Sequence, residues 1–120
     1  MVKIAIPGAA GRMGQELVRT CQATSGVEIG AATEHPDSKA IGRDCGEIAA
    51  IDAVGVSIGT SSDPQCFDVL IDFTRPQPAM NHLDFCLKIN RAMVIGTTGF
   101  SSEDKERITA AARQIPIVFA

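Results

Sequence analysis

The stretch Val2–Gly14 has the sequence VKIAIPGAAGRMG, and it decides the fold that we expect for this chain. Its first part, Val2–Ile6, is a short apolar run rich in β-branched residues, which is typical of a buried parallel strand. The run stops at Pro7-Gly8, and an amphipathic helix that ends near Ser25-Gly26 is expected to follow and pack on the sheet. The positions that predict this helix are Met13, Leu17, Val18 and Cys21.

Strands and helices alternate along the rest of the chain. Val27–Ala32 indicates a second strand, which completes a β-α-β unit whose crossover should be right-handed. From Pro36 to about Pro64 the pattern is weak, and we expect a long, partly mobile connection that contains one short strand. The remaining expected elements are a buried strand over Phe67–Phe73, a helix over Pro76–Ile89, a strand over Ala92–Ile95, a helix that Ser101 and Asp104 begin as a capping box, and a strand over Pro116–Phe119. This alternation predicts a single α/β domain with a doubly wound, mostly parallel, Rossmann-like sheet.

The composition disfavours several classes of partner. A net charge of -3 without a stretch dense in Lys or Arg argues against nucleic acid, because neutralising phosphates takes clustered cations. No apolar run approaches membrane-spanning length, and the amino terminus is too short an apolar stretch for a signal peptide. The cysteines, Cys21, Cys45, Cys66 and Cys86, lack zinc-binding spacing and are typical of buried thiols in a reducing compartment. We therefore expect a cytoplasmic protein with no metal site and no nucleic acid or membrane partner.

Gly8, Gly11 and Gly14 lie between the first strand and the first helix. Glycine at these positions permits a sharp turn, close approach of the main chain to a pyrophosphate, and tight packing of helix on sheet. The amino end of the helix then supplies free N–H donors and the positive end of the helix dipole. The flanking strands and helix give this G-x-x-G-x-x-G motif the context of a dinucleotide site. The alternative is an ordinary glycine-rich turn that binds nothing.

Glu34 stands at the end of the second expected strand, downstream of the glycine motif. An acidic side chain there can accept hydrogen bonds from both hydroxyls of an adenosine ribose, which favours NAD. The same carboxylate would repel the 2′-phosphate of NADP, although Arg12 and a protonated His35 can compensate, so use of both cofactors is conceivable. A solvated carboxylate and a loop histidine without a ligand are the alternatives.

Two further segments are expected at the carboxyl edge of the sheet, where doubly wound folds bind their ligands. In Gly96-Thr97-Thr98-Gly99-Phe100, main-chain N–H and hydroxyl groups can contact a carboxamide or carboxylate, but a turn with positive φ explains the same residues. In Asp72-Phe73-Thr74-Arg75-Pro76, Pro76 suits the first turn of a helix, so its neighbours can be purely structural. His82 has no second metal-type ligand at a suitable offset, and we interpret it as structural.

Together, the segments GAAGRMG, GAATEH, DVLIDFTRP, NHLDFC and VIGTTGF resemble, in this order, the amino-terminal domain of bacterial dihydrodipicolinate reductase. This family is also called 4-hydroxy-tetrahydrodipicolinate reductase. The likeness covers essentially the whole chain, and the pair DFTRP and GTTGF makes it specific. It implies reduction of a cyclic dicarboxylate, a dihydrodipicolinate precursor, by NADH or NADPH in the diaminopimelate and lysine biosynthesis pathway.

The resemblance also implies roles for individual positions. Glu34 would bind the adenosine ribose, and His35 stands beside it where the family often has Arg, which weakens the case for tight 2′-phosphate recognition. Ala120 would open the next loop that contacts the cofactor. The pyrophosphate would be lined by Gly8, Ala9, Ala10, Gly11, Arg12 and Met13. The nicotinamide end would be lined by Phe73, Gly96, Thr97 and Thr98.

In the family, the proton-donating His and the substrate-binding Lys lie in a carboxy-terminal domain that also builds a tetramer. Neither His35 nor His82 matches them, so no catalytic residue is assigned. We expect residues 1–120 to be the dinucleotide-binding domain, inactive and monomeric by itself, with the substrate domain absent from this chain. The alternatives are a non-enzymatic nucleotide-sensing module and another two-domain NAD(P)-dependent dehydrogenase. One acting on an amino-acid semialdehyde would need a nucleophilic Cys beyond a strand, and none is so placed.

Overall fold

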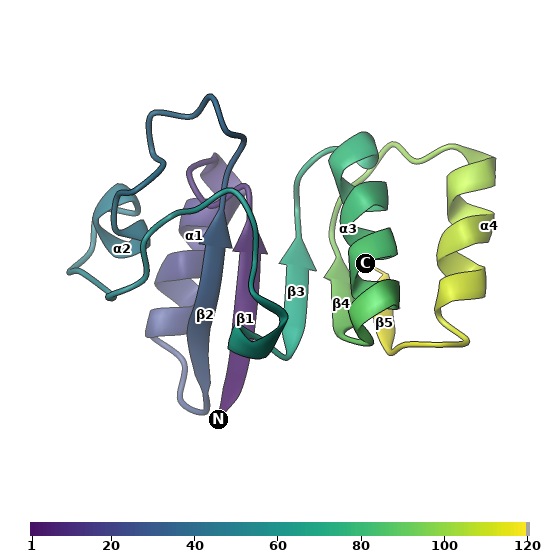
Figure 1. Ribbon diagram of the computed structural model, residues 1–120, viewed down its shortest axis with the longest axis horizontal. Coiled ribbons are helices and arrows are strands. Elements are labelled where there is room, and N and C mark those ends of the chain that lie inside the picture. The colour runs from purple at the N-terminus through teal and green to yellow at the C-terminus, as the bar shows by residue number, and fades with distance from the viewer. Residues whose placement is uncertain (120) are drawn as a thin grey trace.

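The computed structural model describes residues 1–119 and contains one five-stranded sheet with helices on both faces (Figure 1). Its strands follow the order β2-β1-β3-β4-β5, and every strand pair is parallel. The strands are β1 (Val2–Pro7), β2 (Val27–Thr33), β3 (Val69–Asp72), β4 (Ala92–Ile95) and β5 (Ile117–Phe119). The helices are α1 (Arg12–Gln22), α2 (Cys45–Ile48), the short 3₁₀ helix η1 (Pro64–Cys66), α3 (Pro76–Ile89) and α4 (Ser102–Ala111). The predicted doubly wound sheet is confirmed.

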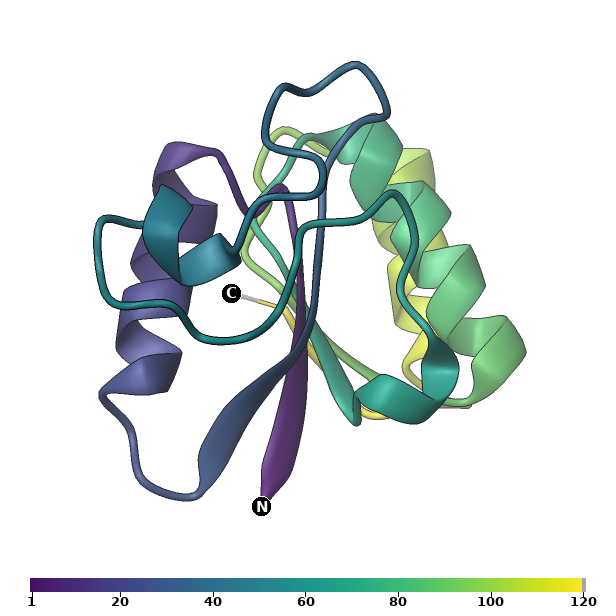
Figure 2. The same ribbon diagram turned by 60° about the vertical axis from the view of Figure 1, so that its left-hand side comes forward.

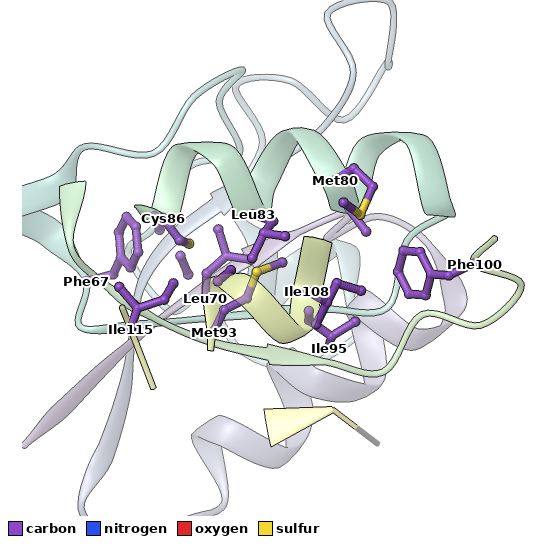
Figure 3. Close-up of a cluster of buried hydrophobic side chains, with 14 residues drawn as sticks. Phe67, Leu70, Met80, Leu83, Cys86, Met93, Ile95, Phe100, Ile108 and Ile115 are labelled. Atoms are coloured by element: carbon purple, nitrogen blue, oxygen red, sulfur yellow. The ribbon is translucent and has the colours of Figure 1, made fainter. Parts of the chain in front are cut away.

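Two apolar clusters hold the helices against the two faces of the sheet. On one face, Val18 and Cys21 of α1 pack with Ile4, Ile6 and Ile29 of the sheet. On the other face, side chains of α3 and α4 pack on β3 and β4, and Figure 3 shows this cluster. Its labelled members are Phe67, Leu70, Met80, Leu83, Cys86, Met93, Ile95, Phe100, Ile108 and Ile115. Fully burying each large apolar side chain stabilises the fold by about 1.5–3 kcal/mol, so these clusters fix which way each helix faces.

The connection between β2 and β3 differs from the expectation. The predicted short strand is wrong: this part of the described chain has only isolated bridges, Thr33 to Gly59 and Asp44 to Ser57. In its place the chain forms α2, which the Asp44 carboxylate caps while also accepting N–H bonds from Val54 and Gly55. One side chain therefore satisfies several backbone donors that a strand would have paired, and Figure 2 shows the connection looping beside the sheet.

Smaller differences concern the ends of elements. Met13 does not face the core as predicted but is 42% exposed, because it lies in the first turn of α1, at the edge of the sheet. α1 ends at Gln22, ahead of the predicted Ser25-Gly26. At α4, the Ser101 hydroxyl accepts the Asp104 N–H at 3.1 Å, while the reciprocal half of the expected capping box is not formed in residues 1–119.

The direction of the crossovers positions the site. The helix after β1 lies on one face of the sheet and the helix after β3 on the other, although β1 and β3 are neighbours. The chain therefore diverges at the carboxyl ends of these two strands and leaves a crevice there, as doubly wound sheets do at such switch points. No helix within residues 1–119 is long and apolar enough to cross a membrane.

Candidate functional site

A cavity of about 830 Å³ occupies this crevice. Its walls come from the glycine motif, the end of β2, the connection that follows β2, and the amino-terminal half of α3. The lining residues are Pro7, Gly8, Gly11, Arg12, Met13, Gly14, Thr33, Glu34, His35, Pro36, Thr60, Phe73, Thr74, Arg75, Pro78, Asn81 and His82. Segments far apart in the sequence thus meet around a space of the size that small-molecule sites have.

The glycine motif forms the floor of the cavity. Gly8 has φ +68, a left-handed conformation that side chains disfavour. Because Gly14 has no side chain, α1 packs closely against this turn. A Cβ at position 14 would lie 2.0 Å from the Gly8 carbonyl oxygen and 2.7 Å from Ala9 Cα. The Ala9 side chain is fully buried beneath, and its N–H donates to the Thr33 carbonyl at 3.1 Å. These contacts place the first turn of α1 directly at the cavity.

The amino end of α1 is left open by the protein. Gly11 is the N-cap residue and makes no side-chain capping hydrogen bond, and the first turn contains no acidic residue. Arg12, Met13 and Gly14, whose N–H groups have no partner one turn earlier in the helix, all line the cavity. Free N–H donors, the positive end of the helix dipole and the Arg12 side chain together favour a bound anion such as a phosphate.

Glu34 lies directly after β2, half-buried beside the glycine motif. Its Oε2 accepts the Ala10 N–H at 2.9 Å and its Oε1 accepts the His35 N–H at 3.2 Å. The carboxylate therefore keeps unused acceptor positions at the cavity wall. The His35 side chain is 72% exposed, and its Nδ1 accepts the Asp37 N–H at 3.2 Å and lies 3.5 Å from the Asp37 carboxylate.

Phe73 marks the other end of the cavity. Its ring lies on Gly96, where a Cβ would be 2.1 Å from the Phe73 Cε1 atom, and the Gly96 N–H donates to the Asp72 carbonyl at 2.8 Å. Thr97 is buried and Thr98 is exposed, and the wall of the cavity is formed here by Phe73 and not by Gly96, Thr97 or Thr98. Positive φ occurs at Gly99, with φ +88, so the turn interpretation holds for that glycine and ring packing explains Gly96. Ala120 lies outside the described residues.

Sequence reasoning missed a polar pair at this end. The fully buried Asp72 carboxylate contacts His82, with Oδ2 to Nδ1 at 2.5 Å, and His82 also lines the cavity. His82 is thus both structural, as predicted, and part of the wall. The signal available was an acid at the end of a buried strand with a His ten positions later on the following helix. Thr60, Pro78 and Asn81 are further lining residues without a sequence signal.

The described residues offer neither a metal centre nor a reactive thiol at the cavity. No group of three or more potential metal-ligating side chains occurs in residues 1–119. No cysteine is among the lining residues of the cavity in the described part of the chain. Burial raises the pKa of Cys45 to about 11, and burial together with the Asp72 charge raises that of Cys86 to about 12. Such thiols stay protonated at neutral pH and are poor nucleophiles.

Comparison with known proteins places the chain in a family. The family model described as dihydrodipicolinate reductase, N-terminus, matches residues 2–120. The chain belongs to this family. The predicted membership of an NAD(P)H-dependent reductase family is therefore confirmed.

A solved structure of the same family has a similar fold. The dipicolinate-bound dihydrodipicolinate reductase from Paenisporosarcina sp. TG-14 is 27% identical, with a TM-score of 0.73 over 100% of this chain. This chain covers 47% of that reductase, so it spans about half the length of the family member.

Two more distant structures show only that the fold is shared. Amine dehydrogenase from Mycobacterium smegmatis is 19% identical with a TM-score of 0.73, over 98% of this chain and 38% of that one. Aspartate semialdehyde dehydrogenase with NADP from Candida albicans is 13% identical with a TM-score of 0.69, over 99% of this chain and 42% of that one.

Proposed function

We propose that this chain is the NAD(P)H-binding domain of a dihydrodipicolinate reductase. The observation that carries the proposal is the uncapped amino end of α1, held by Gly14 against the Gly8 turn and opening into the same cavity as Glu34. A dinucleotide needs a donor cluster for its pyrophosphate and an acceptor for a ribose at one crevice, and these residues fit both needs.

The pyrophosphate is proposed to lie against the segment from Gly8 to Met13. Within it, the Ala9 N–H is bonded to Thr33 and the Ala10 N–H to Glu34. The Gly11 N–H donates to the Gly8 carbonyl at 3.0 Å, so the donors at the helix end that remain for phosphate oxygens are those of Arg12 and Met13, with Ala9 and Ala10 shaping the turn. The Arg12 guanidinium adds a charge at the rim.

Glu34 is proposed to accept hydrogen bonds from the adenosine ribose. This role favours NADH, because a 2′-phosphate would place negative charge beside the carboxylate. Arg12 and His35 also line the cavity and can offset that repulsion. We propose that NADH and NADPH both bind, with NADH depending more on Glu34.

Phe73 and the turn Gly96-Thr97-Thr98 are proposed to bound the nicotinamide end, together with Ala120. When bound, the reduced nicotinamide supplies the hydride. The residues of this chain bind it, orient it and exclude water. The acid that protonates the product and the groups that hold the cyclic dicarboxylate substrate are proposed to lie in a second domain, since this chain covers about half of its solved relative.

The cellular setting follows from the same proposal. The four cysteines are free thiols, and thiols persist in reducing compartments. We therefore propose a cytoplasmic enzyme of diaminopimelate and lysine biosynthesis.

Titration calorimetry of this chain with NADH and NADPH tests the proposal. We expect Kd values between micromolar and millimolar, and no reduction of the dihydrodipicolinate precursor by the chain alone. Absence of binding by both nucleotides contradicts the cofactor role. Turnover by the chain alone contradicts the assignment of the acid and substrate groups to another domain.

A further inference from the structure

Asp72 is a charged group in the interior that the proposed cofactor roles leave unexplained. It ends β3 and its side chain is 0% exposed. A buried carboxylate is costly unless hydrogen bonds or an opposite charge compensate it. The fold therefore has to supply partners for it.

One oxygen of this carboxylate joins two segments near Phe73. Oδ1 accepts the Thr74 N–H at 2.7 Å, the Thr74 hydroxyl at 2.6 Å and the Thr97 hydroxyl at 3.1 Å. Thr74 lines the cavity after β3, and Thr97 belongs to the turn after β4. The same oxygen thus holds the two segments in a fixed relation at the end of the cavity where Phe73 lies.

The other oxygen joins this arrangement to α3. Oδ2 contacts His82 Nδ1, and the His82 side chain is 27% exposed and lines the cavity. Burial acts to raise the pKa of Asp72, but hydrogen bonds from His82 and Thr74 and the charge of His82 outweigh it and lower that pKa. Asp72 is therefore ionised near neutral pH, and His82 Nδ1 carries the proton between them. His82 Nε2 is the ring nitrogen left for a ligand.

We propose that Asp72 and His82 are positioning residues that couple the α3 wall of the cavity to the Thr97 turn. This inference rests on the proposed function. His82 holds the carboxylate, and the carboxylate holds both Thr74, which lines the cavity, and the turn after β4 that contains the buried Thr97. Loosening the pair releases the turn and weakens the contribution of the nicotinamide to binding, while the adenosine diphosphate part of the cofactor keeps its contacts at α1 and Glu34.

Calorimetry of this chain with NADH and with ADP-ribose tests the coupling, because ADP-ribose lacks the nicotinamide. The measured quantity is the ratio of the affinity for NADH to the affinity for ADP-ribose. Thr97→Val removes the hydroxyl with little change of volume, and His82→Leu removes the N–H donor. We expect each substitution to reduce the ratio at least about threefold, the equivalent of about one weak hydrogen bond.

Two further variants separate positioning from stability. His82→Asn keeps a nitrogen donor close to the Nδ1 position, so we expect it to restore most of the ratio that His82→Leu loses. Thr109→Val, on the exposed surface of α4, makes the same chemical change as Thr97→Val away from the cavity and should leave the ratio unchanged. If His82→Leu does not fold, Thr97→Val against Thr109→Val still gives the comparison.

Three outcomes would contradict the coupling or the proposed function. An unchanged ratio in Thr97→Val and His82→Leu overturns the coupling, even if both affinities fall together, because His82 would then be only a cavity wall. Equal affinity of the unsubstituted chain for NADH and ADP-ribose overturns it too. Binding of neither compound to the unsubstituted chain overturns the proposed function itself.

Discussion

The amino ends of α1 and α4 lie at the same edge of the sheet but are completed in different ways. Each helix follows a parallel strand, β1 or β4. At α4 the Ser101 side chain accepts the Asp104 N–H, and Glu103 and Asp104 place negative charge in the first turn. At α1 the N-cap is Gly11, without a capping side chain and without acidic residues in the first turn.

This difference shows how one sheet edge distinguishes a structural helix end from a ligand site. The α4 end satisfies its donors and balances its dipole with its own side chains, so it has little to gain from an anion. The α1 end has these groups unsatisfied and faces a cavity. Four substitutions test this contrast, in order of decreasing expected effect.

Of the four substitutions, Gly14→Ala should disrupt the uncapped amino end of α1 most strongly. The new Cβ would lie 2.0 Å from the Gly8 carbonyl oxygen, so helix and turn must separate. We expect a loss of stability of about 1–3 kcal/mol in urea unfolding and a fall in NADH affinity of about two orders of magnitude. Gly59→Ala is the matched control, since its Cβ would meet only the Ser61 carbonyl at 3.8 Å. Wild-type affinity in Gly14→Ala would show that close packing of α1 is not needed.

Gly11→Asp should make α1 resemble α4. A carboxylate at the N-cap accepts the free N–H groups and repels phosphate, so stability should rise while NADH affinity falls about thirtyfold. Gly11→Ala carries the same Cβ, 3.3 Å from the Gly8 carbonyl oxygen, without the charge, and separates steric from electrostatic effects. Calorimetry and urea unfolding of both variants give the comparison. Equal affinities in the Asp and Ala variants would refute an anion site here.

Glu34→Ala should weaken NADH about tenfold and leave NADPH affinity unchanged or raised, because only the free ribose depends on the acceptor and the substitution removes the charge that repels the 2′-phosphate. Calorimetry with the two nucleotides measures the difference. Glu103→Ala removes an acidic residue from the first turn of α4 and should change neither affinity. Equal losses of NADH and NADPH in Glu34→Ala would disprove the ribose assignment.

Ser101→Ala should have the smallest effect and only on stability. Loss of the cap at α4 costs about 1 kcal/mol, measured as a shift of the urea midpoint, while NADH affinity stays unchanged. Ser102→Ala, next to it but inside the helix, should shift the midpoint less. A fall of NADH affinity in Ser101→Ala would mean that both helix ends belong to the site.

Much of the fold was predictable because its signals are local. The helix over Pro76–Ile89 and the strand over Ala92–Ile95 were placed at their observed ends. The connection after β2 was not, because Asp44 binds backbone groups as far along the chain as Gly55. A side chain that satisfies distant donors leaves no periodic pattern to detect.

The features of the candidate site likewise separate into those with a local sequence signal and those that depend on long-range contacts. By itself the sequence determined the glycine motif, the acid after the second strand and the family, since each depends on residue types at short spacings. Only the tertiary structure decided that Phe73 and not Thr97 lines the cavity, that the Ala10 N–H is already used by Glu34, and that His82 reaches Asp72. These facts depend on how strands and helices distant in the chain pack together, because a buried charge or an unpaired donor takes whichever partner the fold brings within about 3 Å.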